Sequence, residues 1–255
     1  MTYLIFFQHS PAERYFMKVR GNRVLITGGS SGIGLALAEK FVTEQNEVIV
    51  TGRNAERLLE SKNRIPGIRT QVADMSDVAD LKYLAETYPN INILINNAGV
   101  QHNNRFSSVD YSVDAIREEL EINLIGPVLL SKLYCEKWAK NSAEAAIVNV
   151  SSGLAIVPKQ SAPVYCASKA GLHIFSRSLR WQLEGSGIQL FEIIPPMVDT
   201  AMTENRVGAK ISPTQLVEEF WKAFRRDKFE VRIAKVKLLA AIQRFAPAIA
   251  DRIMR

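Results

Sequence analysis

The stretch from Arg23 to Ala38 restricts most strongly what this chain can fold into. It begins with an apolar run typical of a strand buried on both faces, and then turns through glycines at 28, 32 and 34. Apolar residues at helical spacing follow, which predicts a helix. Such a turn presents backbone N–H groups and the positive end of a helix to a pyrophosphate. Because a tight strand–helix turn also needs glycine for steric reasons, the G-x-x-x-G-x-G spacing alone leaves both interpretations open.

The same turn also fits a second motif. Residues 28–32 match G-x-S-x-G, the nucleophile elbow of hydrolases, which would make Ser30 a nucleophile. That chemistry needs an acid and then a histidine further along the chain, and only His102 and His173 follow. His173 falls in an apolar helical pattern, which is typical of a packed histidine. A serine hydrolase is therefore a remote alternative.

Length and composition indicate an ordinary globular protein. The 255 residues are 47% hydrophobic, and no apolar run reaches the roughly 18 residues of a membrane span. The first sixteen residues lack the basic head and cleavage site of a signal peptide. We interpret 1–16 as a dispensable arm before a single domain at 17–255. Two cysteines and three scattered histidines predict a reducing, cytoplasmic setting and no metal site.

Strand patterns alternate with helix patterns along the chain. Strands are expected at 23–27, 47–51, 68–73, 91–95, 146–150, 188–194 and 229–233, and helices at 55–63, 78–88, 113–140, 163–184, 214–224 and 234–254. Gly126-Pro127 predicts a kink in the longest helix. The alternation predicts a doubly wound, mostly parallel seven-stranded sheet with helices on both faces. In such sheets ligands bind beyond the carboxyl ends of the strands.

Small and polar residues follow these strands in a pattern that suits a dinucleotide. Position 52, where an acid would bind the ribose of NAD, is glycine, and Arg53 follows it. A guanidinium suits a phosphate, so the sequence favours NADP(H), with NAD(H) also possible; alternatively, Arg53 is a solvated loop residue. Asp74 could accept from the adenine amino group or cap the next helix. Asn97-Ala98-Gly99 could join neighbouring strands and leave room for a cofactor.

Three further polar residues have no simple place in a core. Asn123 lies in an apolar helical stretch, so its amide either joins neighbouring segments by hydrogen bonds or is part of a polar relay. Tyr165 and Lys169 are four residues apart and share one face of a helix.

The last part of the chain is distinct in charge and pattern. From Lys222 onward it carries ten Lys and Arg against three Asp and Glu, while the net charge of the whole chain is +6. We expect a solvated basic face rather than contact with nucleic acid or stable binding to a membrane. Pro247 should bend or break the helix at 234–254. An apolar stripe along that helix is expected to pack on the body near the substrate entrance (Leu238, Leu239, Ile242, Phe245, Ile249, Ile253).

Taken together, these motifs resemble the short-chain dehydrogenase/reductase family. The resemblance rests on Thr27 to Gly34, Asn96 to Gly99, Asn123, Ser152, Tyr165-x-x-x-Lys169 and Pro195 to Thr200, and covers roughly 18–200 in order and spacing. The whole chain also resembles a group of bacterial oxidoreductases named for a D-alanylation operon, the DltE type. Pro196 departs from the family, which usually has glycine there.

The resemblance implies a Rossmann-like fold and a nicotinamide-dependent oxidoreductase of carbonyl or alcohol substrates. It implies a catalytic tetrad of Asn123, Ser152, Tyr165 and Lys169, and a homodimer or homotetramer built through the helices near 113–140 and 163–184. A lysine ammonium beside Tyr165 and the positive ring of the oxidised cofactor should favour its phenolate, so that Tyr165 acts as general acid or base. The implied cofactor-binding residues are Gly28, Ser30, Ser31, Gly32, Ile33, Gly34, Arg53, Asp74, Met75, Asn97, Ala98, Gly99, Tyr165, Lys169, Pro195, Val198 and Thr200.

Two questions stay open in the sequence. The substrate pocket is expected from Gln101, His102, 157–161 and a mobile lid at 197–213, and none of these carries a selective charge pattern. A nucleotide-binding sensor or scaffold of the same fold is the alternative to an enzyme.

Overall fold

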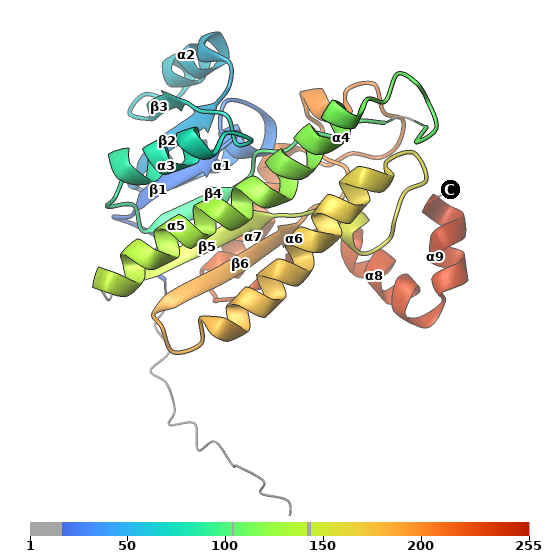
Figure 1. The fold of residues 1–255 in the computed structure, drawn as a ribbon. Helices are drawn as coiled ribbons and strands as arrows, with labels where there is room; N and C mark the ends of the chain where they lie inside the picture. The colour runs from blue at the N-terminus through green and yellow to red at the C-terminus, as the bar shows by residue number, and fades with distance from the viewer. Residues whose placement is uncertain (1–16, 104, 142–143, 255) are drawn as a thin grey trace, which may run out of the picture.

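Seven parallel strands form one sheet at the centre of the protein. The computed structural model describes residues 17–103, 105–141 and 144–254. The strand order is β3-β2-β1-β4-β5-β6-β7 (Figure 1). Strands β2 and β3 are added on one side of β1 and strands β4 to β7 on the other, so the switch point lies between β1 and β4. The strands are β1 Arg23–Thr27, β2 Glu47–Gly52, β3 Arg69–Val72, β4 Ile93–Asn96, β5 Ala145–Val150, β6 Ile188–Ile194 and β7 Glu230–Arg232. The predicted doubly wound, Rossmann-like sheet is confirmed, and every strand pair is parallel.

Helices cover both faces of the sheet and form two hydrophobic cores. The helices are α1 Gly32–Thr43, α2 Ala55–Arg64, α3 Val78–Thr87, α4 Val113–Leu120, α5 Gly126–Asn141, α6 Pro163–Gln182, α7 Pro213–Phe224, α8 Val236–Phe245 and α9 Pro247–Met254. Phe41 of α1 packs edge-on against Trp221 of α7 in one core. Tyr134 and Trp138 of α5 stack in the other. The central strands β1, β4, β5 and β6 are almost wholly buried, which explains their continuous apolar runs.

The long helical region is irregular next to Gly126-Pro127, where a kink was expected. A π-helical segment, Glu121–Ile125, joins α4 to α5 and ends directly before Gly126. A proline at 127 has no N–H to donate to the Asn123 carbonyl and crowds it, which accounts for a wider turn there. Gly126 is packed closely, since a Cβ there would collide with the carbonyl oxygen of Met75, and the π turn buries the Asn123 side chain completely.

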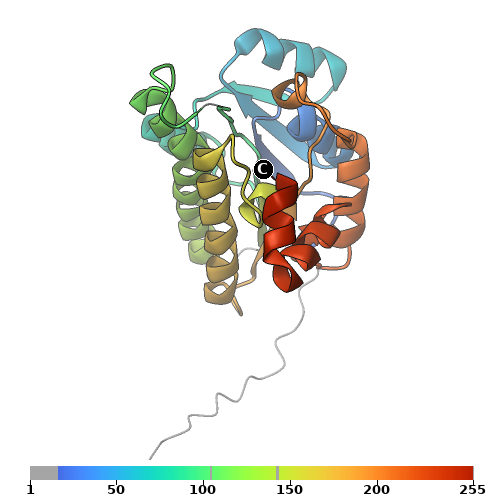
Figure 2. The same cartoon turned by 90° about the vertical axis from the view of Figure 1, so that its right-hand side faces the viewer.

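The C-terminal helix breaks where the sequence predicted. Ala246 separates α8 from α9, and Pro247 begins α9. The predicted placement of the apolar stripe against the body is confirmed in part. Leu238, Leu239, Ile242 and Ile253 line a cavity at the carboxyl ends of the strands, whereas Phe245 and Ile249 are more than half exposed. The residues that α8 and α9 bury are Val236, Ala240 and Ala250. Figures 1 and 2 place both helices at the edge of the sheet where the strands end.

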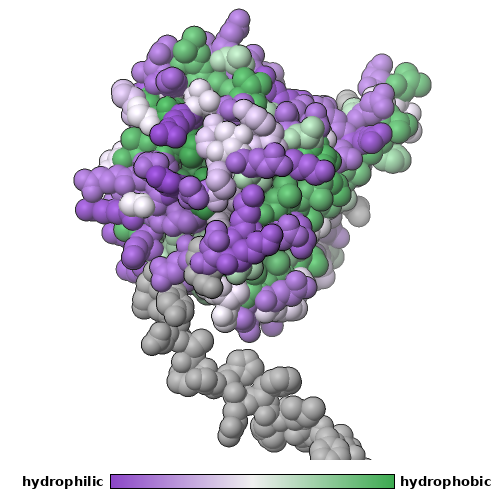
Figure 3. Space-filling model, turned by 60° about the vertical axis from the view of Figure 1, so that its left-hand side comes forward, coloured by the Kyte–Doolittle hydropathy of each residue, from purple (hydrophilic) through white to green (hydrophobic). Residues whose placement is uncertain are grey.

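Among residues 17–103, 105–141 and 144–254, no helix is long and apolar enough to cross a bilayer. On the face shown in Figure 3, hydrophilic residues interleave with hydrophobic ones.

Candidate active site

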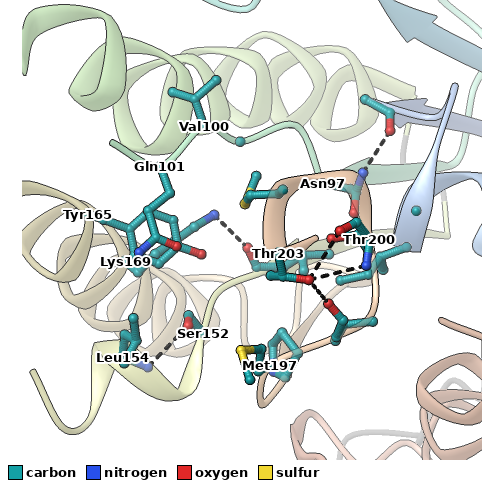
Figure 4. Close-up of a pocket in the computed structure, with 18 of the residues that line it drawn as sticks. Asn97, Val100, Gln101, Ser152, Leu154, Tyr165, Lys169, Met197, Thr200 and Thr203 are labelled. Carbon is teal, nitrogen blue, oxygen red and sulfur yellow. Dashed lines mark hydrogen bonds between the residues drawn. The ribbon is translucent and has the colours of Figure 1, made fainter. Parts of the chain in front are cut away.

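A cavity of about 1130 Å³ follows the carboxyl ends of the strands. One end lies at the β1–α1 turn and the end of β2, and the other extends beneath the 197–213 segment to α8 and α9. Figure 4 shows side chains that face it from α6, from the end of β5 and from the loop after β6. The sequence predicted this position from the alternation of strands and helices. The strand order adds that the switch point between β1 and β4 opens a crevice there.

The glycine-rich turn is held against the end of β4. Gly28 has a φ of +63°, and a Cβ there would lie 2.8 Å from the Cα of Ala98. The Asn97 Nδ2 donates to the carbonyl oxygens of Thr27 and Gly28, each at 3.0 Å. The Thr27 Oγ1 accepts from the backbone N–H groups of Asn97 and Ala98, also at 3.0 Å. The expected joining of strands by Asn97 is confirmed.

The amino end of α1 is arranged to receive an anion. Ser31 is its N-cap residue but makes no capping hydrogen bond with its side chain, and no acidic residue lies in the first turn. Ser30, Ser31, Gly32 and Ile33 all line the cavity. Open N–H groups at the positive end of a helix fit a pyrophosphate, so the residues present suit a dinucleotide.

Most of the predicted cofactor residues line this cavity. Those that do are Gly28, Ser30, Ser31, Gly32, Ile33, Arg53, Asp74, Met75, Asn97, Ala98, Gly99, Tyr165, Lys169, Pro195, Val198 and Thr200. Gly34 does not, because it lies beneath the turn, where a Cβ would collide with the Gly28 carbonyl oxygen.

Arg53 is paired with acids in this structure. Its Nη1 lies 2.7 Å from Oε1 of Glu118 in α4 and 3.9 Å from Oδ2 of Asp74. The Arg53 side chain remains half exposed. Asp74 Oδ1 also accepts from the N–H and the hydroxyl of Ser76, while Asp77 is the residue that caps α3. Asp74 therefore does not cap α3, which was one of the two roles that the sequence allowed for it.

Tyr165 and Ser152 meet at the middle of the cavity. Ser152 follows β5, and its Oγ accepts from the N–H of Leu154 at 3.1 Å. Tyr165, only 8% exposed, points from α6 into the same space (Figure 4). Burial raises the pKa of Tyr165 to about 12, although its hydrogen bond with Ser152 and the charge of Arg206 act to lower it. Desolvation thus outweighs the nearby charges in setting this pKa, and the expectation that Lys169 and the oxidised cofactor together favour the phenolate stays a prediction.

Lys169 lies one turn beyond Tyr165 on the same face of α6. Its Nζ donates to the carbonyl oxygen of Val150 at 3.0 Å and lies 5.8 Å from the centre of the Tyr165 ring. Burial lowers the pKa of Lys169 to about 8, against the opposing charges of Glu192 and Glu119. At neutral pH the ammonium still predominates.

Asn123 joins the segment at Val100 to α6 by hydrogen bonds at the edge of the site. Its Oδ1 accepts from the N–H of Val100 at 2.9 Å, and its Nδ2 donates to the Val100 carbonyl at 2.8 Å and to Ser168 Oγ at 3.2 Å. It does not line the cavity itself. A Cβ on Gly99 would nevertheless lie 3.1 Å from Asn123 Oδ1 and 3.5 Å from Lys169 Nζ, so both groups approach the same glycine.

The substrate side of the cavity differs from the sequence-based expectation. Gln101 and Lys159 line it, but His102 does not. Arg206, Lys159 and Lys235 give this side a positive charge that the sequence analysis missed. The sequence contains all three cations, but the residues around each of them do not indicate that the three line one cavity.

The geometry gives no support for a serine hydrolase. His173 Nδ1 lies 2.9 Å from Glu192 Oε2, and His102 Nε2 lies 3.5 Å from Glu118 Oε2. Across the described part of the chain, no histidine is hydrogen-bonded to Ser30.

Comparisons with known proteins identify relatives. The sequence profile described as short chain dehydrogenase matches residues 22–210. The chain is 40% identical over 231 residues to the uncharacterized oxidoreductase DltE of Bacillus subtilis, which covers 87% of this chain and 91% of that protein. It is 31% identical over 186 residues to L-xylulose reductase of Caenorhabditis elegans, covering 71% and 73% of the two chains.

Solved structures agree with the fold. A short-chain dehydrogenase from Burkholderia cenocepacia in complex with NADP superposes with a TM-score of 0.84 at 25% identity, covering 94% of this chain and all of that one. A second structure, from Burkholderia phymatum in complex with NAD, has a TM-score of 0.82 at 18% identity, with coverages of 94% and 97%.

Proposed function

The chain belongs to the short-chain dehydrogenase/reductase family, and from this premise we propose that it transfers a hydride between NADP(H) and a carbonyl or alcohol substrate, with Tyr165 as general acid or base. The observation that carries the proposal is the meeting of Tyr165, Ser152 and Lys169 in one cavity with the glycine-rich turn. The family consists of oxidoreductases, and its members bind nicotinamide cofactors. The choice of cofactor and the residue roles are our proposal.

The roles follow from the positions of the side chains. The bound nicotinamide would supply or accept the hydride. Ser152 Oγ would hold the substrate oxygen beside the Tyr165 hydroxyl. Because the pKa of Tyr165 is about 12, its hydroxyl is protonated at neutral pH and ready to donate in the reductive direction. The Lys169 ammonium, 5.8 Å from the centre of the Tyr165 ring, would stabilise the phenolate by its charge.

Asn123 would act through position rather than contact. Its three hydrogen bonds fix the segment at Val100 to Ser168 of α6. It therefore holds Gly99 open beside Lys169, which is the positioning role that we propose for it.

NADP(H) is the cofactor that the charges favour. Arg53 and Arg57 both line the end of the cavity beyond β2, and position 52 carries no carboxylate. A phosphate on the ribose would find two guanidinium groups there, whereas a free hydroxyl would find no acceptor from position 52. NAD(H) should bind more weakly.

Turnover separates an enzyme from a sensor or scaffold. Purified protein should oxidise NADPH with members of a panel of ketones, aldehydes and quinones, and Tyr165→Phe should abolish turnover while NADPH affinity stays within a few-fold. Tyr83→Phe, on the exposed face of α3, is the matched control. Tight NADPH binding with no turnover of any compound would indicate a sensor, and a Tyr165→Phe enzyme with normal kcat would refute the acid–base role.

Assembly and location are part of the same proposal. Ile125, Ile174 and Trp181 expose apolar surface on the helices through which a homodimer or homotetramer would form. We propose a cytoplasmic protein with one domain at 17–255, no nucleic-acid partner and no stable membrane binding. A monomeric mass by light scattering, or sedimentation with anionic vesicles at physiological salt, would contradict it.

A further inference from the structure

The cavity continues past Tyr165 into an apolar chamber. Its walls come from the 197–213 segment and from α8 and α9, through Met197, Met202, Val207, Leu239, Ile242 and Met254. Met197 is visible at one side of this space in Figure 4. The segment that covers it is anchored, because Ile211 N–H donates to the Met197 carbonyl and Asp199 N–H donates to the Ile211 carbonyl. A chain of methylene groups would fit such walls better than a polyol would.

The guanidinium of Arg206 faces this chamber and is hydrogen-bonded to a neutral side chain. Arg206 is half-buried, and its guanidinium donates from Nη1 to Oε1 of Gln101, a neutral amide. Within residues 17–103, 105–141 and 144–254, no carboxylate lies within 4.0 Å of it. By contrast, Lys210 in the same segment pairs with Asp199 at 3.5 Å. A partly desolvated guanidinium that uses one of its donors on a neutral amide retains the capacity to bind an anion.

The position of Arg206 relates that capacity to the reaction. Gln101 and Tyr165 line the same part of the cavity, and the charge of Arg206 acts on the Tyr165 hydroxyl. An anion bound by Arg206 would therefore share the cavity with an oxygen held by Tyr165 and Ser152. The other cations on this side, Lys159 and Lys235, add to the positive potential, and no acid from the described part of the chain lines the chamber.

We propose that Arg206 binds a carboxylate of the substrate, so that the substrate is an oxo acid or hydroxy acid with an apolar chain lying against α8 and α9. This inference rests on the proposed function and names its substrate class. In the reductive direction the oxo carbon takes the hydride from NADPH, its oxygen takes the Tyr165 proton, and the carboxylate stays unchanged on Arg206. We favour a carboxylate over a doubly charged phosphate because a single guanidinium faces the reacting oxygen. Two parallel N–H groups of the Arg206 guanidinium can bind the two oxygens of a carboxylate.

A binding experiment tests the inference without turnover. Octanoate and octanamide are titrated by calorimetry into the protein saturated with NADP⁺. We expect octanoate to bind at least tenfold more tightly, and Arg206→Gln to remove most of this difference. Arg206→Lys should retain part of it, since a point charge remains without the fork. Lys210→Gln removes a positive charge from the same segment away from the cavity and should leave the difference unchanged.

A kinetic comparison separates this inference from the proposed function. The kcat/KM for 2-oxo-octanoate is measured against that for its methyl ester, and Arg206→Gln should lower the ratio at least tenfold. Reduction of neutral ketones without any preference for octanoate over octanamide would overturn the inference and leave the proposed function intact. A tenfold preference for octanoate in a protein that turns over nothing would support the carboxylate site and refute the reductase.

Discussion

Arg53→Ala should weaken the binding of NADPH far more than that of NADH. The Arg53 guanidinium is the half-exposed cation at the end of the cavity that would meet the ribose phosphate. A hydrogen bond to a charged group contributes about 1.5–3 kcal/mol. Since 1.4 kcal/mol corresponds to a tenfold change in Kd, the variant should lose about 10- to 100-fold in NADPH affinity. NADH affinity should change by less than about twofold, because it carries no group for Arg53 to bind.

The neighbouring acid makes the prediction sharper. Glu118 lies 2.7 Å from the Arg53 guanidinium, and a phosphate must compete with it. Both side chains are more than a third exposed, and such pairs contribute about 0.2–1 kcal/mol. Glu118→Gln should therefore tighten NADPH binding by about 1.5- to 5-fold. In the Arg53→Ala background the same change should have a smaller effect, because the competition is already gone.

The assay is fluorescence titration of both cofactors at low and physiological salt. Added salt should reduce the difference between the parent and Arg53→Ala, since exposed charges are screened. Glu136→Gln is the control, because Glu136 forms a comparable exposed pair with Lys132 on α5. Equal weakening of NADPH and NADH by Arg53→Ala, or weaker NADPH binding in Glu118→Gln, would refute the reasoning.

Three further perturbations test the site and the fold. Lys169 titrates at about 8 when folded against an ordinary value of 10.5, so the unfolded state binds more protons between these values. Relative to Lys169→Met, the free energy of unfolding of the parent protein in urea should therefore rise by about 2 kcal/mol between pH 7 and 9.5. The same pH dependence of this free energy in both proteins would contradict the prediction. Gly34→Ala places a Cβ against the Gly28 carbonyl and should cost about 1–3 kcal/mol of stability and most NADPH affinity; an unchanged Tm would show that the turn can relax. Residues 1–16 lie outside the described structure. A protein that begins at Met17 keeps the packing of that buried residue, so it should retain its Tm and activity. A loss of several degrees in Tm would show that the arm packs on the body.

The sequence by itself determined the sheet, its order of elements and the place of the site. The strand at Ile188–Ile194 was predicted at its observed bounds, because a short, mostly apolar run between a glycine and two prolines has few other structures available. The glycine-rich turn and the strand-end residues also followed from the sequence. Parallel strands bring their carboxyl ends to one edge, so Arg53, Asn97 and Ser152 had to converge.

Only the tertiary structure decided the electrostatics and the substrate side of the cavity. The pKa of Tyr165 depends on how much water its surroundings exclude, and burial raises it to about 12 against the hydrogen bond with Ser152 and the charge of Arg206. Arg206 and Gln101 are 105 residues apart, and no local pattern specifies their hydrogen bond. The stripe on α8 and α9 had the period of a packed helix, yet its larger residues partly line a cavity or face solvent. Periodicity reports which residues share a face, whereas only the packing of distant segments fixes what that face touches.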